Sequence, residues 1–270
     1  MESKISVLMG IYNCADTLEE AVQSIQNQTY SNWELIMCDD GSTDCTYQVA
    51  YKLTEQDSRI RLLRNDKNCG LNKTLNSCLN FATGEFVARM DGDDQCVPDR
   101  FEKQLEFLEQ HSEYDIVSSS MILFDENGEW GRTSVIETPC SEDIIAGSPI
   151  CHAPVMMRKC CMDTVGGYTE DKRMIRVEDV NLWIKLYAAG YRCYNLQEPL
   201  YMMRNDQNAL QRRKYKYRVN SVYVRLQGCK VLHLGPSSYV KAIKPMLIGL
   251  VPAKLRHVIR RIQQGKVNNG

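Results

Sequence analysis

Short apolar runs alternate with stretches of helical spacing over the first 110 residues. The runs have the length of strands and occupy Ile5–Ile11, Trp33–Cys38, Ile60–Leu63 and Glu85–Met90. Between and after them, apolar residues recur three and four positions apart, which predicts helices over Asp16–Gln28, Thr46–Asp57, Leu71–Ala82 and the residues that follow Pro98. Four successive strand-then-helix units predict an α/β fold, with a mainly parallel sheet and helices on both faces.

The alternation becomes looser beyond residue 112. The pattern there predicts strands over Ile116–Phe124, Arg192–Leu196 and Leu200–Met203, a turn over 126–131 and a helix over Val180–Ala189. Two basic helices are expected over Leu210–Leu226 and 239–264. The first half of the chain is therefore the better defined part of the predicted fold.

Charge is distributed unevenly along a chain of ordinary globular composition, 43% hydrophobic and 25% charged. Residues 207–270 contain 14 Lys and Arg and no Asp or Glu, whereas the total net charge is only −1. A basic tail on an acidic body indicates a negatively charged surface as its partner. Residues 239–266 combine an apolar stripe with seven basic residues, which suits a helix on an anionic membrane. The alternative is a helix packed on the domain with its basic face in water.

Several partners and environments are not indicated by the sequence. No nucleic-acid recognition motif accompanies the basic tail, so nucleic acid is not expected as a partner. The twelve cysteines include no C-x-x-C pair, which favours reduced, core-filling thiols over a zinc site or a disulfide framework. The chain has no signal-peptide pattern and no window of about eighteen apolar residues. We therefore expect a cytosolic protein.

Two clusters of carboxylates follow predicted strands. Asp39 and Asp40 close the second strand, and Asp91, Asp93 and Asp94 close the fourth. Ligands of open α/β sheets bind outside the carboxyl ends of the strands, so both clusters should lie on one rim. Carboxylates that converge raise each other's pKa unless a cation lies between them, and Mg²⁺ or Mn²⁺ suits such oxygen ligands.

Other interpretations of the two clusters have to be weighed. DDGSTD (39–44) is a good turn sequence before a helix, with Asp and Ser as capping residues. An EF-hand is excluded for the second cluster, because Cys96 stands where the sharp turn of that loop requires glycine. The two clusters together, rather than either alone, therefore predict a site where a divalent cation binds a diphosphate.

Six motifs in order make the sequence resemble the family 2 glycosyltransferases, inverting enzymes of the GT-A fold. They are SVLMGIYN (6–13), DDGSTD (39–44), NCGLNKTLN (68–76), GEFVARMDGDD (84–94), GGY…VED (166–179) and LYMMRND (200–206). The resemblance covers about residues 4–210. In style the chain is most similar to transferases that build bacterial surface polysaccharides on a lipid carrier.

The resemblance implies a set of donor-binding residues. Their matched positions, which would contact the nucleotide, the sugar or the diphosphate, are Ile11, Tyr12, Asp39, Asp91, Asp93, Asp94 and Arg204. Asp39 matches the aspartate that binds the base, typically uracil, and Asp93 matches the ligand of Mn²⁺ or Mg²⁺. Arg89 faces either the donor or solvent, and Arg204 either binds phosphate or forms a structural ion pair.

The same resemblance implies the catalytic base and the acceptor side. Asp179 matches the base, which an inverting transfer needs opposite the leaving group, within reach of the acceptor hydroxyl. The acidic pair Glu178–Asp179 also suits the start of a helix, where acids complement the helix dipole. Glu178, His152 and Trp130 are the candidates for the acceptor side, although a lone histidine is more often structural.

The sequence departs from the family pattern at two places. Gly10 stands where members usually have proline, and Asn205 and Asp206 follow Arg204 where many have a histidine near the diphosphate. Either Asp206 is a metal ligand, or this region has lost direct contact with phosphate.

Taken together, these features predict a metal-dependent, inverting glycosyltransferase at the inner face of the cell membrane. A catalytic domain would span 1–206, with a nucleotide-binding half (1–112) and an acceptor half (113–206), followed by a basic helical extension (207–270). The donor would be a nucleotide-diphosphate sugar, most simply a UDP-sugar, and the acceptor a lipid-linked saccharide. A non-catalytic nucleotide-sugar-binding module and a sugar nucleotidyltransferase are the alternatives; the second normally has a glycine-rich, basic loop that MGIYNCADT lacks.

Overall fold

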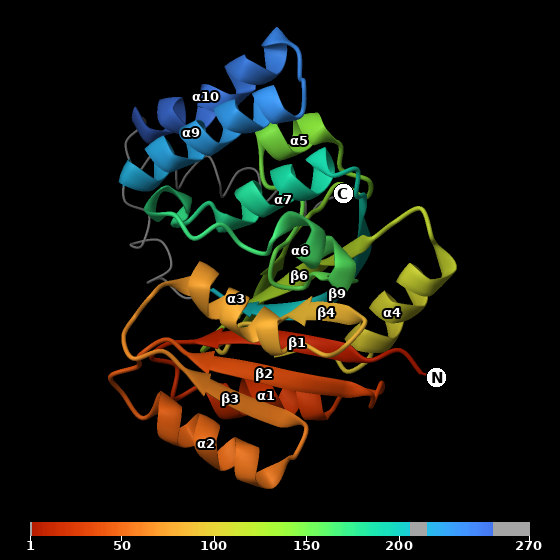
Figure 1. Ribbon diagram of the computed structural model, residues 1–270, viewed down its shortest axis with the longest axis vertical. Helices are drawn as coiled ribbons and strands as arrows, with labels where there is room; N and C mark the ends of the chain where they lie inside the picture. The colour runs from red at the N-terminus through yellow and green to blue at the C-terminus, as the bar shows by residue number, and fades with distance from the viewer. Residues whose placement is uncertain (1, 206–214, 251–270) are drawn as a thin grey trace.

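The computed structural model describes residues 2–205 and 215–250, and its first half confirms the predicted alternation. Four parallel strands lie in the order β3-β2-β1-β4. They are β1 (Ile5–Ile11), β2 (Trp33–Asp39), β3 (Ile60–Arg64) and β4 (Phe86–Arg89), joined by the helices α1 (Leu18–Gln26), α2 (Thr46–Gln56) and α3 (Leu71–Phe81). Figure 1 shows these strands side by side, with their helices packed around them.

Beyond β4 the sheet becomes mixed, so it is mainly parallel only in its first half. It continues as β4-β8-β6-β9-β5, with β7 paired to β6. The strand β8 is antiparallel to both β4 and β6, whereas β9 is parallel to β6. The bounds are β5 (Gln95–Cys96), β6 (Ile116–Asp125), β7 (Gly128–Arg132), β8 (Met156–Arg158) and β9 (Cys193–Arg204).

Two details of the second half differ from the sequence prediction. The segments 192–196 and 200–203 are one long strand, β9, whose register with β6 shifts between Ser119 and Met121. The irregularity lies opposite the polar break that divides the apolar pattern. The segment 126–131, expected as a turn, contains most of β7, which forms a hairpin with β6.

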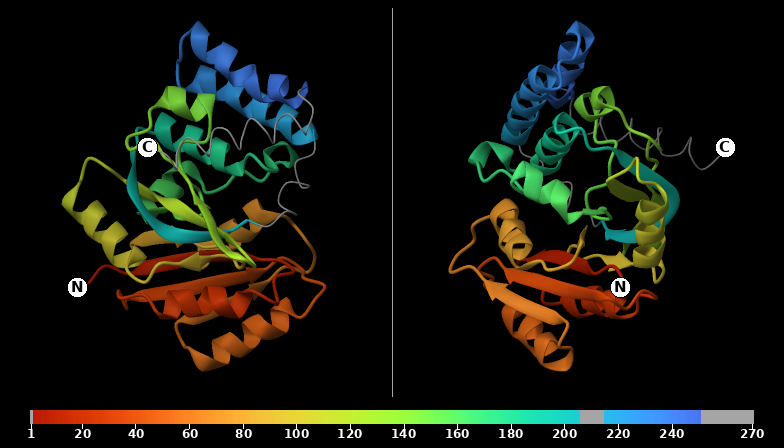
Figure 2. Two further views of the ribbon diagram at one scale, coloured as in Figure 1. Left: turned by 180° about the vertical axis from the view of Figure 1, so that it is seen from behind. Right: turned by 45° about the vertical axis from the view of Figure 1, so that its right-hand side comes forward.

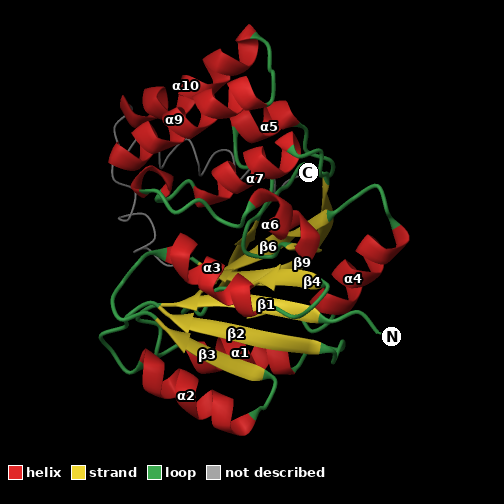
Figure 3. Cartoon of the chain, in the orientation of Figure 1, coloured by secondary structure: helices red, strands yellow, loops and turns green. Residues whose placement is uncertain are grey.

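Helices cover both faces of the sheet (Figure 3). Alternate residues of β1 and β2 point to opposite faces, so Val7 and Met37 join one buried cluster, and Leu8 and Ile36 the other. The first cluster includes α1, α2 and α4 (Arg100–Gln110). The second includes α3, α5 (Ser141–Ala146), α6 (Lys159–Val165) and α7 (Glu178–Ala188), with the 3₁₀ helix η1 (Lys172–Met174) beside it.

The described C-terminal helices, α9 (Tyr215–Val231) and α10 (Pro236–Leu250), lie against α5 and α7. They form an antiparallel pair at the opposite end of the molecule from α2 (Figures 1 and 2). A Cβ on Gly228 would lie 2.5 Å from Ile184 Cδ1 and 2.9 Å from Ile145 Cδ1, so this glycine permits the close approach of α9. Because Val224 and Cys229 belong to the second buried cluster, α9 shares its core with α7.

Two further expectations can be compared with the described residues. All twelve cysteines are free thiols, and six of them are buried. No helix within 2–205 or 215–250 has the length and apolar content needed to cross a bilayer.

Candidate active site

The loops that follow β1 and β2 are bonded to each other and form one rim. Asn13, at a positive φ of 49°, accepts a hydrogen bond from Thr43 N through Oδ1 at 2.9 Å. Its own backbone N donates to Ser42 Oγ at 3.1 Å, and Cys14 N donates to Thr46 Oγ1 at 2.8 Å. The segment DDGSTD is therefore a turn before a helix and part of a larger rim, so the two interpretations of this motif coincide.

Two adjacent residues predicted for the nucleotide pocket face different surroundings. Ile11 is buried in the core, where its backbone O accepts a hydrogen bond from Asp40 N at 2.9 Å. Tyr12 is 46% exposed at the exit of β1. In this arrangement only the Tyr12 side chain is available to a ligand, and Ile11 supports the rim from beneath.

The two aspartates that close β2 have different partners. Asp39 is fully buried, accepts from Ser42 N at 3.3 Å and lies 3.3 Å from Arg64 Nε. The carboxylate of Asp40 instead accepts from Cys69 N and Gly70 N, both at 2.8 Å, at the start of α3. The prediction that both side chains converge on the rim is therefore wrong for Asp40. The Asp40 carboxylate instead accepts hydrogen bonds from backbone N–H groups at the start of a helix.

The loop after β4 lies against the same rim. Thr17 Oγ1 donates to Gly92 O at 2.9 Å. A Cβ on Gly92 would lie 2.9 Å from Cys14 Sγ and 3.1 Å from Ile11 Cγ2, so only glycine permits this approach. The structure therefore brings the residues 91–94 beside the exit of β1, as the rim prediction required.

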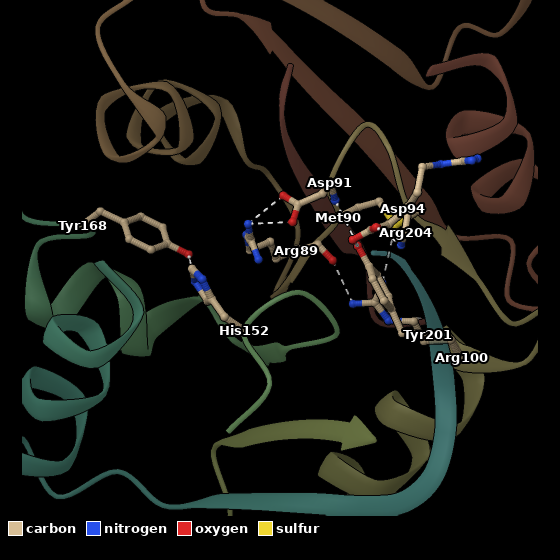
Figure 4. A network of polar contacts seen from close by, with 9 residues as sticks. All are labelled: Arg89, Met90, Asp91, Asp94, Arg100, His152, Tyr168, Tyr201 and Arg204. Carbon is tan, nitrogen blue, oxygen red and sulfur yellow. Dashed lines mark hydrogen bonds and ion pairs between the residues drawn. The ribbon is translucent and has the colours of Figure 1, made fainter. Parts of the chain in front are cut away.

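A buried arginine precedes these aspartates. Arg89 is 8% exposed, and its Nη2 lies 2.6 and 2.9 Å from the two carboxylate oxygens of Asp91 (Figure 4). Its Nε is buried and makes no hydrogen bond to the described residues. Arg89 therefore faces the site, which excludes the interpretation of a solvated strand end.

Asp94 and Arg204 are joined through β9. Tyr201 Oη donates to Asp94 Oδ2 at 2.9 Å, and Arg204 N donates to Asp94 Oδ1 at 2.8 Å. Burial, followed by the charges of Asp91 and Asp93, raises the pKa of Asp94 well above its usual value. The Arg204 side chain forms an ion pair with Glu20 at 3.1 Å and donates to Asp93 O at 3.1 Å. The structural ion pair is thus present, and phosphate binding by Arg204 stays a prediction.

Arg100, which the sequence pattern did not single out, supports this region from within the core. Its side chain is fully buried, and Nη2 donates to the carbonyl oxygens of Arg89 (2.9 Å) and Val155 (3.3 Å). Its Nε donates to Gln104 Oε1 at 3.0 Å. Arg100 therefore fixes the end of β4 from behind. Its only sequence signal was a charged residue on the apolar face of a predicted helix.

The predicted base and its neighbour form the first two residues of α7. Asp179 Oδ1 accepts from Val180 N at 2.7 Å. Burial raises the pKa of Asp179, whereas this bond and the charges of Arg225 and Arg89 lower it. Burial and the charge of Asp179 also raise the pKa of Glu178. Asp179 is thus a helix-start acid whose environment suits proton transfer.

The acceptor-side candidates His152 and Trp130 have different surroundings in the structure. His152 Nε2 lies 2.8 Å from Tyr168 Oη (Figure 4). The His152 ring also meets the Trp183 ring edge-on, with 5.6 Å between the centroids. Burial, and then the charge of Arg89, lowers the pKa of His152 well below its usual value. His152 therefore lies beside the charged cluster as a neutral ring. Trp130 is 44% exposed on β7. Contact of Glu178, His152 or Trp130 with an acceptor stays a prediction.

The carboxylates of the rim fit a metal ion that is coordinated by few protein ligands and by the substrate. Among residues 2–205 and 215–250, no three His, Cys, Asp or Glu side chains are arranged as a closed metal site. Mg²⁺ and Mn²⁺ need no such site, because one or two carboxylates and substrate phosphates suffice. Asp93 supplies hard oxygen donors within a cluster of three carboxylates, whose mutual repulsion a cation would relieve. The other predicted ligand, Asp206, lies outside the described residues.

Two hollows in the described surface lie away from this rim. One, of about 340 Å³, is lined by Trp33 and Ile60 at the beginnings of β2 and β3. The other, of about 440 Å³, lies beside α5 and is lined by Cys140 and Tyr187. Neither contains the acids of the site, so the candidate active site is defined by its side chains and loops.

The fold is that of a glycosyltransferase of the GT-A type. Residues 6–179 match the family described as Glycosyl transferase family 2, and the chain belongs to that family. It is 42% identical to the "Putative glycosyltransferase EpsE" of Bacillus subtilis (strain 168), over 98% of this chain and 95% of that one. It is 30% identical to the "UDP-Glc:alpha-D-GlcNAc-diphosphoundecaprenol beta-1,3-glucosyltransferase WfaP" of Escherichia coli, over 71% and 73% of the two chains.

Solved structures confirm the GT-A fold. The S. aureus TarS fragment 1–349 in complex with UDP-GlcNAc superposes with a TM-score of 0.71, covering 90% of this chain and 71% of that one at 20% identity. The mannosyltransferase PcManGT of Pyrobaculum calidifontis, in complex with GDP-Man and Mn²⁺, gives a TM-score of 0.64, covering 97% and 79% at 16% identity. The family match and the EpsE relative confirm the predicted class of enzyme, a family 2 glycosyltransferase.

Proposed function

We propose that this glycosyltransferase transfers one sugar, with inversion, from a UDP-sugar to a lipid-linked saccharide during synthesis of a bacterial surface polysaccharide. The observation that carries the proposal is the arrangement around Arg89. This cation is paired with Asp91 on the donor rim, and its charge also lowers the pKa of Asp179 at the start of α7. The name of the relative WfaP, which states a UDP-Glc donor and a diphosphoundecaprenol-linked acceptor, supports the substrate classes.

The proposed reaction assigns a role to each side of the site. Asp39 and Tyr12 bind the nucleoside, and Asp91 and Asp94 hold the ribose and the sugar. Asp179 takes the proton of the acceptor hydroxyl, whose oxygen forms a bond to the anomeric carbon while the bond from that carbon to the diphosphate breaks. The proton remains on Asp179, and UDP leaves with the electron pair of the broken bond. A divalent cation at Asp93, when bound, would stabilise the negative charge of the departing diphosphate.

The surface of α10 supports a peripheral membrane position on the cytoplasmic side. Ala242 is buried, whereas Val240, Ile243 and Met246 are 68%, 39% and 44% exposed and alternate with exposed lysines. Packing on the domain and exposure of an apolar face therefore coexist in this helix. The rest of the predicted membrane segment, 251–266, lies outside the described residues. Co-sedimentation should be stronger with anionic vesicles than with zwitterionic ones, and equal binding would contradict the membrane role.

A donor screen tests the reaction itself. The full chain is incubated with a panel of nucleotide sugars, a lipid-diphosphate-linked saccharide and Mn²⁺ or Mg²⁺, and released nucleotides are quantified. The proposal expects UDP from one UDP-sugar, an inverted anomeric configuration in the product and loss of turnover with EDTA. Release of pyrophosphate, or no turnover with any donor, would contradict it.

A further inference from the structure

The helix α9, which packs against the helix that carries the proposed base, contains a buried arginine. Arg225 is 5% exposed, although a guanidinium is costly to bury unless its donors are satisfied. It lies well beyond residue 179, where the match to the family ends. The close approach at Gly228, where α9 contacts Ile184 of α7 and Ile145 of α5, fixes this part of the helix against the helix that carries Asp179.

The hydrogen bonds of Arg225 hold it in place without neutralising its charge. Nη1 donates to the carbonyl oxygens of Ile144 and Ile145, the latter at 2.7 Å, in the last turn of α5. Nε donates to Ser221 Oγ at 3.1 Å. Within the described ranges 2–205 and 215–250, no carboxylate lies within 4.0 Å of this guanidinium to form a salt bridge. Its positive charge therefore remains available to act on nearby acids.

The acid on which this charge acts is Asp179. Burial lowers the pKa of Arg225 and Asp179 raises it, while in return Arg225 lowers the pKa of Asp179. The other charged or titratable groups that face Asp179 are Glu178 on its own helix, Arg89 on β4 and Tyr168 in the loop before η1. Arg225 and Arg89 both lower the pKa of Asp179, so α9 supplies one of the two cations that act on this acid.

We propose that Arg225 is a positioning residue that keeps Asp179 ionised, so that α9 completes the active site of the enzyme. A half-buried base at the start of α7 needs a compensating cation if it is to accept a proton near neutral pH. Arg89 is paired with Asp91 on the donor side, whereas the hydrogen bonds of Arg225 within the described residues go to α5 and Ser221 and to none of the donor-binding candidates. This inference rests on the proposed role of Asp179 as the base.

The charge and the hydrogen bonds of Arg225 can be separated by substitution. Arg225→Gln retains an amide donor for the α5 carbonyls but removes the charge, whereas Arg225→Lys retains the charge. Arg225→Met is a second neutral variant of similar length. Lys230→Gln, at an exposed position of the same helix, removes one charge away from the site and is the matched control. Unchanged affinity for UDP identifies the variants that keep the native fold.

The readout is the pH dependence of kcat at saturating donor and acceptor. The neutral variants should move the acid limb of the profile upward by about one pH unit, because loss of a nearby cation raises the pKa of the base. On that limb, kcat should then fall about tenfold while the donor KM stays unchanged. Arg225→Lys and Lys230→Gln should leave the limb in place.

Two results would overturn the inference. One is an unshifted acid limb in a neutral variant that still binds UDP as tightly as the wild type. The other is a lower melting temperature with a uniform loss of kcat at every pH, in the neutral variants and in Arg225→Lys alike, which would assign Arg225 a structural role only. Turnover of Asp179→Asn is measured alongside. If that variant stays active, the base assignment itself fails, whereas an inactive Asp179→Asn with an unshifted Arg225→Gln limb rejects Arg225 alone.

Discussion

The hydroxyl of Tyr201 joins the two ends of the aspartate loop, and its removal should weaken both folding and donor binding. Tyr201 is fully buried on β9, where Oη donates to Asp94 Oδ2 at 2.9 Å and accepts from Asp91 N at 3.1 Å. Tyr201→Phe removes both bonds and leaves the ring, which lies beneath the Arg100 guanidinium at 5.1 Å. The substitution therefore tests the bridge alone, without opening a large cavity.

The expected cost follows from the two bonds. Each contributes about 1 kcal/mol net, and a buried N–H or carboxyl oxygen left without a partner adds to that. We expect the free energy of unfolding of Tyr201→Phe to fall by about 2–3 kcal/mol, which corresponds to roughly 5–10 °C in Tm for a chain of this size. Because the loop that contains Asp91 and Asp94 loses both hydrogen bonds to Tyr201, UDP should bind about tenfold more weakly, equivalent to about 1.4 kcal/mol of binding free energy.

Urea unfolding and calorimetric titration of UDP measure the two effects. Tyr187→Phe is the matched control, because Tyr187 is also buried and its Oη donates to Pro139 O at 2.8 Å, away from the rim. That variant should lose about 1 kcal/mol of stability and keep its affinity for UDP. A loss below about 0.5 kcal/mol in Tyr201→Phe, or equal UDP affinities in the two variants, would refute this reasoning.

Three further substitutions test other parts of the structure. Gly41→Ala should lower the free energy of unfolding in urea by about 2 kcal/mol or more and weaken UDP binding, because φ is +70° and the new Cβ would lie 2.7 Å from Lys67 C. The control is Gly131→Ala, whose Cβ would meet nothing nearer than 3.7 Å and which should change this free energy by less than about 0.5 kcal/mol. Between pH 7.5 and 5.5 the wild type should lose about 1 kcal/mol more unfolding free energy than His152→Asn. The pKa of His152 is lowered by burial and then by the charge of Arg89, so this histidine takes up its proton only on unfolding. The same pH dependence of stability in both proteins would contradict this. Burial would raise the pKa of Glu34, but hydrogen bonds from Ser6 and Thr83 outweigh it and lower this pKa to about 2, so the stabilisation by Glu34 is present above about pH 4.5 and is lost as the pH falls towards 2. Glu34→Gln should therefore narrow the difference in unfolding free energy between pH 5 and 2.5, and an unchanged difference would argue against this account.

The sequence predicted the parts of the fold that depend on local pattern. Strands β1 to β4 and their helices follow from periodicity, and the loops after β2 and β4 lie on one rim because parallel strands end at the same edge. The pairing of β8 between β4 and β6 joins residues about 40 to 70 positions apart, and no local pattern specifies such a partner. The division of the chain at residues 112 and 206 stays a prediction.

Side-chain partners were less accessible to sequence reasoning. Asp40 resembles Asp39 in the sequence, yet it turns to the backbone at Gly70, because the start of α3 has unsatisfied N–H groups. Arg100 and Arg225 carry no signal beyond a charged residue on a partly apolar helix, since burial of an arginine depends on distant carbonyl groups. A cation at a position that helical spacing assigns to the core is the signal that could have identified them.

The central claim is that Asp179 removes the acceptor proton at a site where the donor is held by other residues. The most direct test compares Asp179→Asn with the wild type, measuring kcat under saturating substrates and the affinity for UDP by titration. We predict that kcat falls by about 10² to 10⁴ while UDP binds with unchanged affinity. A variant that retains kcat within about tenfold of the wild type, or loses UDP binding in parallel with turnover, would contradict it.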